Sequence, residues 1–405
     1  MKLLKLHVDG VPLFSNNSFT LDLYAQDRVP LLEGSTEPND VFRLEKIGNT
    51  YSQNIIGLSG VNASGKTTVL NILKLVLMMF AENATIRAFS SSTVQRIGKI
   101  DDKLHIQAIF WEEPNYYLIE STIQLSQDSG EGDGRFDYNS LVFVDETLWK
   151  YESSRMTRKS LASVDQFKEE SKIVLRRKGE SSDETVLTED AKRFLKDNTS
   201  IVMAVHNVDA VVVESRNREL PEASFSTAIV QAFDSSIEQL DWDEESGVYK
   251  LKFKDEPLRT VSPEVAKAIL SRGTVEGTEL VTHAIEILKN GGYLVIDEIE
   301  EGLNRSLVAA VLDLFASPVT NPCGAQIVFS THYPQLLDSI HRKDNVYVLV
   351  RDNECKSELI KLSAKVQRIE RKKSEIILSN LIKGSTPRYP DVQAMREYVK
   401  VCVNG

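Results

Sequence analysis

The chain has 405 residues, of which 41% are hydrophobic and 26% charged, as in a folded protein of two or three domains. The formal net charge of −11 excludes a protein whose whole surface holds DNA by charge, although it leaves local basic patches open. No apolar run approaches the ~20 residues of a membrane span, no signal peptide is recognisable, and three scattered cysteines exclude a disulfide framework, so we expect a reducing, cytoplasmic setting.

The first ~50 residues read as strands and turns, and the alternation in "MKLLKLHVDGVPLF" predicts a first β-strand. Asn54 to Gly60 then reads as a short buried strand, and Thr67 to Phe80 as a helix. Between them, Gly60-Val-Asn-Ala-Ser-Gly65-Lys66-Thr67 fits the P-loop pattern G-x-x-x-x-G-K-[ST] at every fixed position. The alternative, a turn before a core helix, is disfavoured because strand, loop and helix follow in the order that puts phosphates on a helix N-terminus.

A P-loop predicts a site for ATP with Mg²⁺. We expect the loop amides to face the phosphates, Lys66 to supply positive charge, and the Thr67 hydroxyl to ligate Mg²⁺. The predicted nucleotide-binding residues of this loop are Gly60, Asn62, Ser64, Gly65, Lys66, Thr67 and Thr68.

The middle of the chain predicts a strand-rich continuation and an insertion. The predicted elements are two antiparallel strands over His105 to Gln124, a Gly/Asp/Ser-rich loop over Ser126 to Asp137, a strand in "LVFVDETLWKY", a charged and partly helical main insertion from Lys159 to Thr199, a helix over Phe225 to Leu240 and a strand over Val248 to Lys254. No heptad pattern is sustained, so a long coiled-coil arm is not expected.

Three basic stretches are visible: Arg155 to Lys159, Arg176 to Lys178, and Arg368 to Lys373. None is interleaved with aromatic residues. A solvated charged face is therefore favoured for each, with DNA contact as the alternative.

Ser271 precedes a predicted helix within "AILSRGTVEGTELVTHAIEIL". Ser271 is suited to cap this helix, and the helix N-terminus with the Gly273 amide forms an anion site. An ordinary capped helix is an equally good interpretation of this segment alone.

The segment "GGYLVIDEIEEGL" predicts the second half of the nucleotide site. Tyr293 to Ile296 form a buried strand that ends in Asp297 and Glu298. Asp297 would hold Mg²⁺ through water, and Glu298 would polarise the attacking water. The alternative is a core strand that ends in a solvated acidic turn.

A further buried strand, "QIVFSTHYPQLLDS", is closed by Ser330, Thr331 and His332. A histidine at the tip of the strand after the acidic one is placed to reach the γ-phosphate. Alone, His332 would read as a surface histidine, and only its spacing from Asp297 favours a role in the site.

The ordered set of P-loop, insertion, "LSRGT", "LVIDEIEEGLN" and "STH" resembles the ABC-type ATPase head, and more narrowly the AAA-family ATPases related to the OLD proteins and the SMC-like repair ATPases. The resemblance implies an α/β ABC-type P-loop head with an inserted α/β or helical subdomain. We expect core segments at 1–94 and 261–350, a strand-rich continuation with the insertion at 95–260, and a C-terminal extension at 351–405.

In such heads the signature of one subunit closes on the nucleotide of another. Carried over, Ser271 and Gly273 would contact the nucleotide of a partner, Glu298 would be the catalytic base and His332 the switch histidine, and a homodimer or a higher oligomer is implied. Relatives often carry histidine where Asn304 stands, which leaves that loop's role open. The Q-loop glutamine also stays open among Gln95, Gln107 and Gln124.

Three functions follow from the resemblance. The favoured one is an ATP-driven switch that controls a separate nuclease or toxin, in an anti-phage defence or toxin–antitoxin-like setting, because no second active site is recognisable and no Toprim-type acidic cluster follows His332. The alternative is a DNA-repair or chromosome-associated ATPase that binds DNA directly through the basic stretches. A transporter ATPase subunit is least favoured, because of the long insertion and the strand-rich start.

Overall fold

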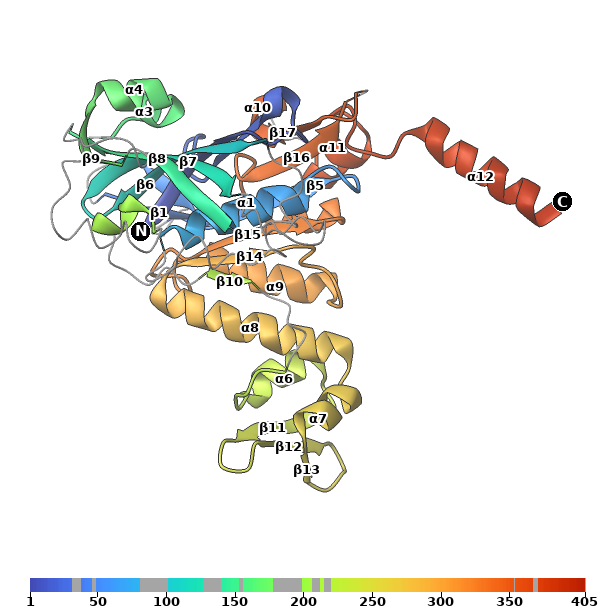
Figure 1. The fold of residues 1–405 in the computed structure, drawn as a ribbon. Helices are drawn as coiled ribbons and strands as arrows, with labels where there is room; N and C mark the ends of the chain where they lie inside the picture. Colours follow the sequence, from blue (N-terminus) through green and yellow to red (C-terminus); the bar gives the residue numbers. More distant parts are fainter. Residues whose placement is uncertain are drawn as a thin grey trace, which may run out of the picture.

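The computed structural model describes residues 1–30, 38–45, 49–80, 101–126, 140–152, 156–177, 199–205, 212–214, 220–352, 354–366 and 371–404. Two large β-sheets lie on either side of one helix, further helices cover the second sheet, and a small unit hangs below the body (Figure 1). The α/β P-loop architecture predicted for an ABC-type ATPase head, with an inserted α/β unit, is confirmed.

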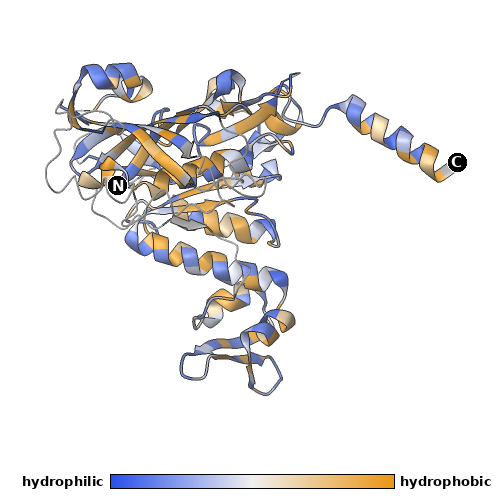
Figure 2. Ribbon diagram, viewed as in Figure 1, coloured by the Kyte–Doolittle hydropathy of each residue, from blue (hydrophilic) through white to orange (hydrophobic). Residues whose placement is uncertain are grey.

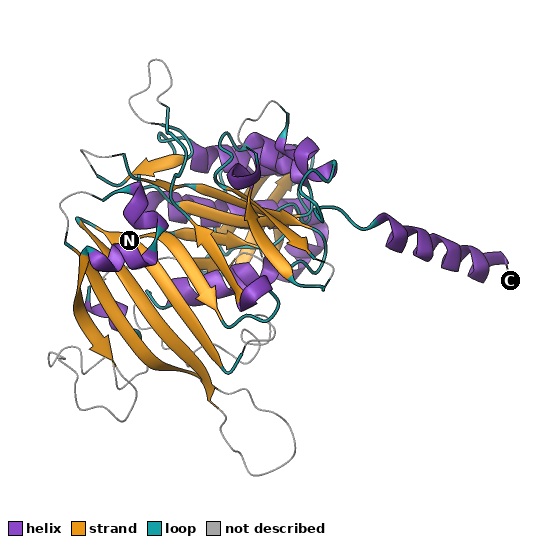
Figure 3. Cartoon of the chain, turned by 90° about the horizontal axis from the view of Figure 1, so that it is seen from above, coloured by secondary structure: helices purple, strands orange, loops and turns teal. Residues whose placement is uncertain are grey.

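The first sheet is antiparallel, in the order β2-β1-β6-β7-β8-β9, and forms the broad sheet seen in Figure 3. Its strands are β1 (Lys2–Asp9), β2 (Ser18–Asp22), β6 (Lys103–Glu112), β7 (Asn115–Ser126), β8 (Ser140–Tyr151) and β9 (Ser171–Arg177). The predicted first strand and the predicted hairpin are therefore confirmed. The glycine-rich loop that follows the hairpin, apart from Ser126, lies outside the described residues.

The second sheet has the order β10-β14-β15-β5-β16-β17 and is parallel except for β17. Its strands are β5 (Ile55–Gly60), β10 (Val212–Glu214), β14 (Tyr293–Ile296), β15 (Gln326–Thr331), β16 (Val346–Arg351) and β17 (Ser357–Lys361). Near-continuous apolar runs such as Tyr293–Ile296 suit strands that are covered on both faces. The carboxyl ends of β14, β15 and β5 lie side by side, which is where open α/β sheets bind ligands.

Helix α1 (Lys66–Met78) lies between the two sheets and is buried along almost its whole length. The opposite face of the parallel sheet packs against α8 (Arg272–Asn290), α9 (Arg305–Ala316), the 3₁₀ turn η4 (Pro334–Ser339) and α11 (Lys373–Leu378). Hydrophobic residues accordingly concentrate in α1 and in the sheet strands (Figure 2). These layers fix the end of β5 and the start of α1, between which the P-loop runs.

A separate core forms below the body from α6 (Thr227–Phe233), β11 (Ile237–Asp243), β12 (Val248–Phe253), β13 (Arg259–Val261) and α7 (Pro263–Ile269). The prediction of one helix over Phe225 to Leu240 is wrong in its second half. Asp234 ends the helix, since its Oδ1 accepts hydrogen bonds from the amide and hydroxyl of Ser236. Ile237 and Leu240 then pair with β12 as a strand.

The remaining elements are short or peripheral. They are η1 (Ser15–Asn17), β3 (Val41–Arg43), β4 (Tyr51–Gln53), α3 (Arg158–Ala162), α4 (Val164–Glu169), η3 (Ile201–Ala204), α10 (Leu362–Lys365) and α12 (Tyr389–Asn404). Of the insertion predicted at Lys159 to Thr199, residues 178–198 lie outside the described part. Helix α12 projects away from the body in both ribbon views (Figures 1 and 3). None of the helices in the described ranges is both long enough and apolar enough to span a membrane.

Candidate functional site

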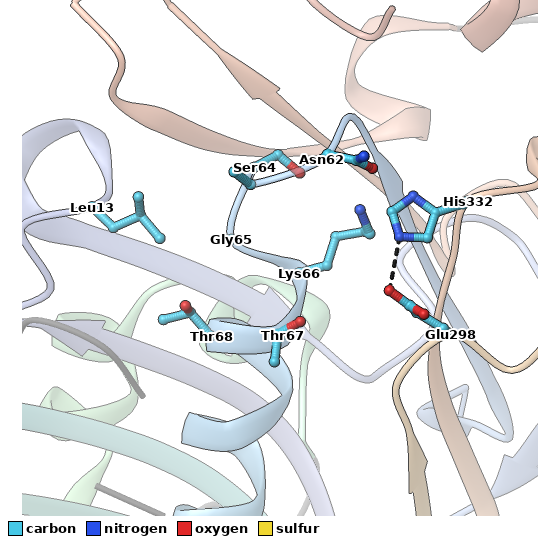
Figure 4. Close-up of a pocket in the computed structure, with 10 residues that line it drawn as sticks. Leu13, Asn62, Ser64, Gly65, Lys66, Thr67, Thr68, Glu298 and His332 are labelled. Carbon is cyan, nitrogen blue, oxygen red and sulfur yellow. Dashed lines mark hydrogen bonds and ion pairs between the residues drawn. The ribbon is translucent and has the colours of Figure 1, made fainter. Parts of the chain in front are cut away.

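A pocket of about 330 Å³ opens at the junction of β5 and α1 (Figure 4). It is lined by Leu13, Asn62, Ala63, Ser64, Gly65, Lys66, Thr67, Thr68, Glu298 and His332. The P-loop residues predicted to bind nucleotide thus surround it, except Gly60, which lines a neighbouring cavity on the other side of the loop. Glu298 and His332 reach the same pocket from the ends of β14 and β15, although they are remote from the loop in sequence.

Two glycines are required by the path of the loop. Gly65 has a φ of +96°, and a Cβ there would lie 2.9 Å from Cδ2 of Leu13. At Gly60, a Cβ would lie 2.4 Å from the carbonyl oxygen of Leu349 on β16. Both positions therefore exclude side chains, which keeps the loop tight against the sheet.

The Lys66 side chain reaches across the loop, toward Asn62 and His332 in Figure 4. Its Nζ donates hydrogen bonds to the carbonyl oxygens of Gly60, at 2.9 Å, and Val61, at 3.2 Å. Burial lowers the pKa of Lys66, and this is opposed by the charges of Asp297, Glu298 and Glu300. A buried cation held only by neutral carbonyls is suited to an anionic ligand, which would supply the countercharge that the loop lacks.

Thr67 and Asp297 meet at the start of α1. The Thr67 hydroxyl donates to Oδ2 of Asp297 at 2.6 Å. A hydroxyl and a carboxylate at this separation are hard oxygen ligands of the kind Mg²⁺ prefers, directly or through its water. The residues predicted to hold Mg²⁺ therefore fit the ion chemically. No group of three or more His, Cys, Asp and Glu side chains gathers elsewhere in the described chain in a way that would hold a metal.

Ser330 on β15 organises the acidic turn. Its hydroxyl donates to Oδ1 of Asp297, and it accepts the backbone N–H of Glu298 at 2.8 Å. Glu298 has a φ of 52°, in the left-handed region that non-glycine residues rarely adopt. This turn aims the Glu298 side chain into the pocket, and strained backbone of this kind is concentrated at functional sites.

His332 lies directly beside Glu298. Its Nε2 is 3.0 Å from Oε1 of Glu298, as the dashed line in Figure 4 marks. The backbone N–H of His332 donates to Oε1 of Glu300 at 2.6 Å, and the Glu300 side chain is largely buried. Two acidic residues from the turn after β14 thus fix both the main chain and the imidazole of His332.

Ser271 and Gly273 do not line this pocket. Ser271 caps α8, since its hydroxyl accepts the Thr274 N–H at 3.1 Å, as predicted for a capping residue. A Cβ on Gly273 would lie 2.9 Å from the carbonyl oxygen of Gly302. The start of α8 therefore packs on the loop after β14 of its own chain and does not line the pocket of that chain.

Arg272 stabilises the contact between the start of α8 and the loop after β14. Its Nε donates to Oε1 of Glu276 at 2.7 Å, and its guanidinium also donates to Oε1 of Glu301. Gly302 has a φ of +73°, and a Cβ there would lie 1.8 Å from Oε2 of Glu276. The start of α8 and the loop of Glu301 to Gly302 are consequently held as one unit.

Other predicted positions lie away from the pocket. Gln107 donates to Glu120 across the antiparallel sheet, and neither it nor Gln124 lines the pocket, while Gln95 lies outside the described residues. Asn304 caps α9, since its Oδ1 accepts hydrogen bonds from the amide and hydroxyl of Ser306. A helix-capping role explains asparagine at that position.

Four residues of the site have no role predicted from the sequence: Leu13, Ala63 within the P-loop, Ser330 and Glu300. Leu13 follows β1 and lies across the pocket from Glu298 and His332 (Figure 4), so only the fold brings it to the P-loop. Ser330 and Glu300 stand within the "STH" and "DEIEE" segments. Each is a polar residue at or beside the end of an apolar strand, and this is the feature of the sequence that could have marked it as part of the site.

A family model described as "AAA domain, putative AbiEii toxin, Type IV TA system" matches residues 55–338. Among solved structures, the chain is similar to the SMC head domain from Thermotoga maritima, with 11% identity, a TM-score of 0.40, and coverage of 89% of this chain and 99% of that chain. Among curated proteins, no significant match is found.

Proposed function

The chain belongs to this AAA domain family, and on that premise we propose that it hydrolyses ATP as a switch that controls a separate effector protein. The observation that carries the ATPase assignment is the convergence of Lys66, Thr67, Asp297, Glu298 and His332, from three separate segments, around one pocket. Lys66 would exchange its bonds to loop carbonyls for bonds to phosphate oxygens, which restores a countercharge to a buried ammonium.

The other side chains at the pocket would have separate roles in ATP hydrolysis. Glu298 would accept a hydrogen bond from the attacking water and orient it, and His332 would contact the γ-phosphate and hold Glu298 in place. Thr67 and Asp297 would hold Mg²⁺, which supplies positive charge to the phosphate oxygens when bound. Leu13 would cover the pocket from the side opposite Glu298.

We further propose that two copies complete the site. Ser271 and Gly273 stand at the start of α8, outside the pocket lining of their own chain, and a helix N-terminus is suited to phosphate. Closing two copies on two nucleotides would bring each α8 N-terminus to the pocket of the other. Hydrolysis would then release the pair, and the opening would be what a partner reads.

The effector is proposed to be a nuclease or toxin in a defence or toxin–antitoxin-like system, in line with the narrower resemblance to OLD-related ATPases. The family description, which mentions a toxin and a type IV TA system, supports that setting. Direct DNA binding has less support. In the second basic stretch, Arg177 is buried, lies 3.6 Å from Glu146 and donates to the Thr199 carbonyl, so it does not offer its charge to a phosphate backbone.

The test is affinity purification of the Glu298→Gln chain from its native host, followed by mass spectrometry and nucleic-acid staining. A stoichiometric nuclease or toxin-like protein that is absent with Lys66→Ala would support the switch. Nuclease-sensitive DNA without a protein partner would instead support the DNA-binding alternative. Lys267→Ala, an exposed lysine on α7, is the control for Lys66→Ala and should retain full ATP hydrolysis.

A further inference from the structure

Helix α12 carries a broad apolar face that no other part of the described chain covers. At about 100° per residue, one side of this helix collects its apolar residues, across an arc of about 200°. These residues are Val392, Ala394, Met395, Tyr398, Val399, Val401, Cys402 and Val403. Tyr398 is 72% exposed and Val403 is 77% exposed. Both hydropathy colours therefore run along the projecting helix in Figure 2. An exposed surface of this kind marks an interaction site.

The charges of α12 point to a protein partner. The helix holds Asp391, Arg396, Glu397 and Lys400, two acidic and two basic residues, and the whole chain is acidic. Helices that bind anionic lipid or nucleic acid carry an excess of Lys and Arg on their polar face. On α12 the polar face carries Arg396, Lys400 and Glu397, only one more basic residue than acidic, and Asp391 falls within the apolar arc.

The same chain carries, at the base of α12, a hollow of mixed polar and apolar lining with exposed apolar residues at and beside it. A cavity of about 570 Å³ lies between the P-loop, His332 and the segment that leads into the helix. Leu378 and Pro334 line it, and Leu378 is 51% exposed. Leu381, at 62%, and Tyr333, at 58%, are also exposed, and each neighbours a lining segment in sequence. One chain thus provides both an apolar helix and an apolar surface of the kind that would receive it.

The base of α12 is held, which turns the helix away from its own body. Ser385 donates through its hydroxyl to the Ile377 carbonyl at 2.6 Å, and the Gly384 N–H donates to Oδ1 of Asn380 at 2.9 Å. Arg388 then donates to Asp391 in the first turn of the helix at 2.8 Å. Since α12 projects away from the body in Figures 1 and 3, its apolar face is open to a second copy.

We propose that two copies of this chain exchange their α12 helices. Each helix packs on the surface of Tyr333, Leu378 and Leu381 of the other copy and also along the other α12. These two surfaces together cover the apolar arc of about 200°. The contact is isologous and closes at a dimer. Arg388 and Asp391 share a cavity with Gly60, Asn62 and His332, so the exchanged helices meet at the rim of the nucleotide pocket. This association needs no nucleotide and is separate from the ATP-dependent closure proposed above.

The test is sedimentation equilibrium of the full chain without nucleotide, from about 1 to 50 μM, with two matched variants. Val399→Glu places a carboxylate on the apolar face, and Gln393→Glu places one on the polar face. We expect a wild-type dimer and the same dimer for Gln393→Glu. For Val399→Glu we expect association at least tenfold weaker, since burying a charge opposes association. Circular dichroism checks folding, and Val399 is 52% exposed, so its replacement leaves the core intact.

The proposal is overturned if the wild-type chain is monomeric throughout this range, if it forms open-ended aggregates, or if Val399→Glu associates as strongly as Gln393→Glu. ATP hydrolysis is measured on the same samples. An active wild-type monomer would remove the helix exchange and leave the ATPase assignment standing. A nucleotide-free dimer without ATP hydrolysis would support the helix exchange and remove the ATPase assignment.

Discussion

Nε2 of His332 lies 3.0 Å from Oε1 of Glu298, so the two side chains proposed to act at the γ-phosphate are in direct contact. Glu298 is aimed there by a left-handed turn, and His332 is held by Glu300 through its main chain. The pair is therefore positioned by elements other than the P-loop, from two neighbouring strands of the parallel sheet.

Glu298→Gln should lower kcat for ATP hydrolysis by about 10²–10⁴-fold while leaving ATP binding intact, because the amide keeps the shape of the side chain and loses its basicity. With ATP and Mg²⁺ the variant should accumulate in an ATP-bound dimer. Steady-state hydrolysis and nucleotide content after gel filtration measure both. Glu286→Gln, at an exposed glutamate on α8, should behave as wild type. Unchanged hydrolysis in Glu298→Gln would remove this residue from the mechanism.

His332→Ala should also lower hydrolysis, and its effect should not add to that of Glu298→Gln. Residues that act through one contact show coupling in a double-mutant cycle. The double variant is expected to hydrolyse ATP about as slowly as Glu298→Gln alone. Independent, multiplicative losses would show that the 3.0 Å contact between the two side chains has no part in turnover.

Gly302→Ala should destabilise the chain more than Gly247→Ala does. Both glycines have positive φ values, +73° and +63°, so both substitutions carry the same kind of backbone strain. A Cβ at Gly247 meets nothing within 4 Å, whereas one at Gly302 would lie 1.8 Å from Oε2 of Glu276. We expect a cost of about 1 kcal/mol for Gly247→Ala and at least about 2 kcal/mol for Gly302→Ala.

Urea unfolding of the two glycine variants measures that difference. Gly302→Ala should also reduce hydrolysis, because Glu276 and Arg272 shift with the start of α8. Equal stabilities would mean that the Glu276 side chain moves aside freely.

Because of Lys2, we expect the free energy of unfolding to increase at alkaline pH. Burial lowers its pKa to about 8 from an ordinary 10.5, and its Nζ donates to the carbonyls of Cys323, at 2.8 Å, and Gly324. Between pH 8 and 10.5 the folded chain releases this proton while the unfolded chain keeps it, so the free energy of unfolding increases with pH in that window. Below pH 8 both forms are protonated and the contribution of Lys2 is least favourable.

Lys2→Met removes the titrating group while keeping much of its volume. The stability of wild type relative to this variant should increase by up to about 3 kcal/mol from pH 7.5 to 10.5, measured by urea unfolding. Comparing the two chains cancels the other groups that titrate in this range. Parallel stability curves would show that Lys2 keeps an ordinary pKa in the folded chain.

The sequence predicted the elements that hold the site because their signals are local. Tyr293 to Ile296 is an uninterrupted apolar run, and the P-loop has fixed residues at fixed spacing, so strand, loop and helix could be placed without a fold. Ser271 as a helix cap is also a local property, and the structure confirms it.

What the sequence could not predict depends on contacts between distant segments. Leu13 reaches the pocket only because β1 lies over α1 in the layered core, and nothing in its own neighbourhood marks it. Residues 237–240 were assigned to a helix because Ile237 and Leu240 also fit helical spacing, and only pairing with β12 makes them a strand. The proposed contact of α12 is likewise made with a second molecule, and residue spacing within one chain does not predict it.

Lys66 of one copy is proposed to work with Ser271 of another, and heterodimers whose two chains carry different tags test this directly. In the first heterodimer, one chain carries Lys66→Ala and the other Ser271→Arg. In the second, a single chain carries both substitutions and its partner is wild type. The two assemblies contain the same mutations and differ only in their distribution.

If the sites are shared between copies, the first heterodimer keeps one intact site and about half of wild-type hydrolysis, while the second has a defect in each site and is inactive. If each chain builds its site alone, the order reverses: the first heterodimer is inactive and the second keeps about half. We expect ATP hydrolysis in the first assembly and none in the second, and the opposite pattern would contradict a site shared between copies.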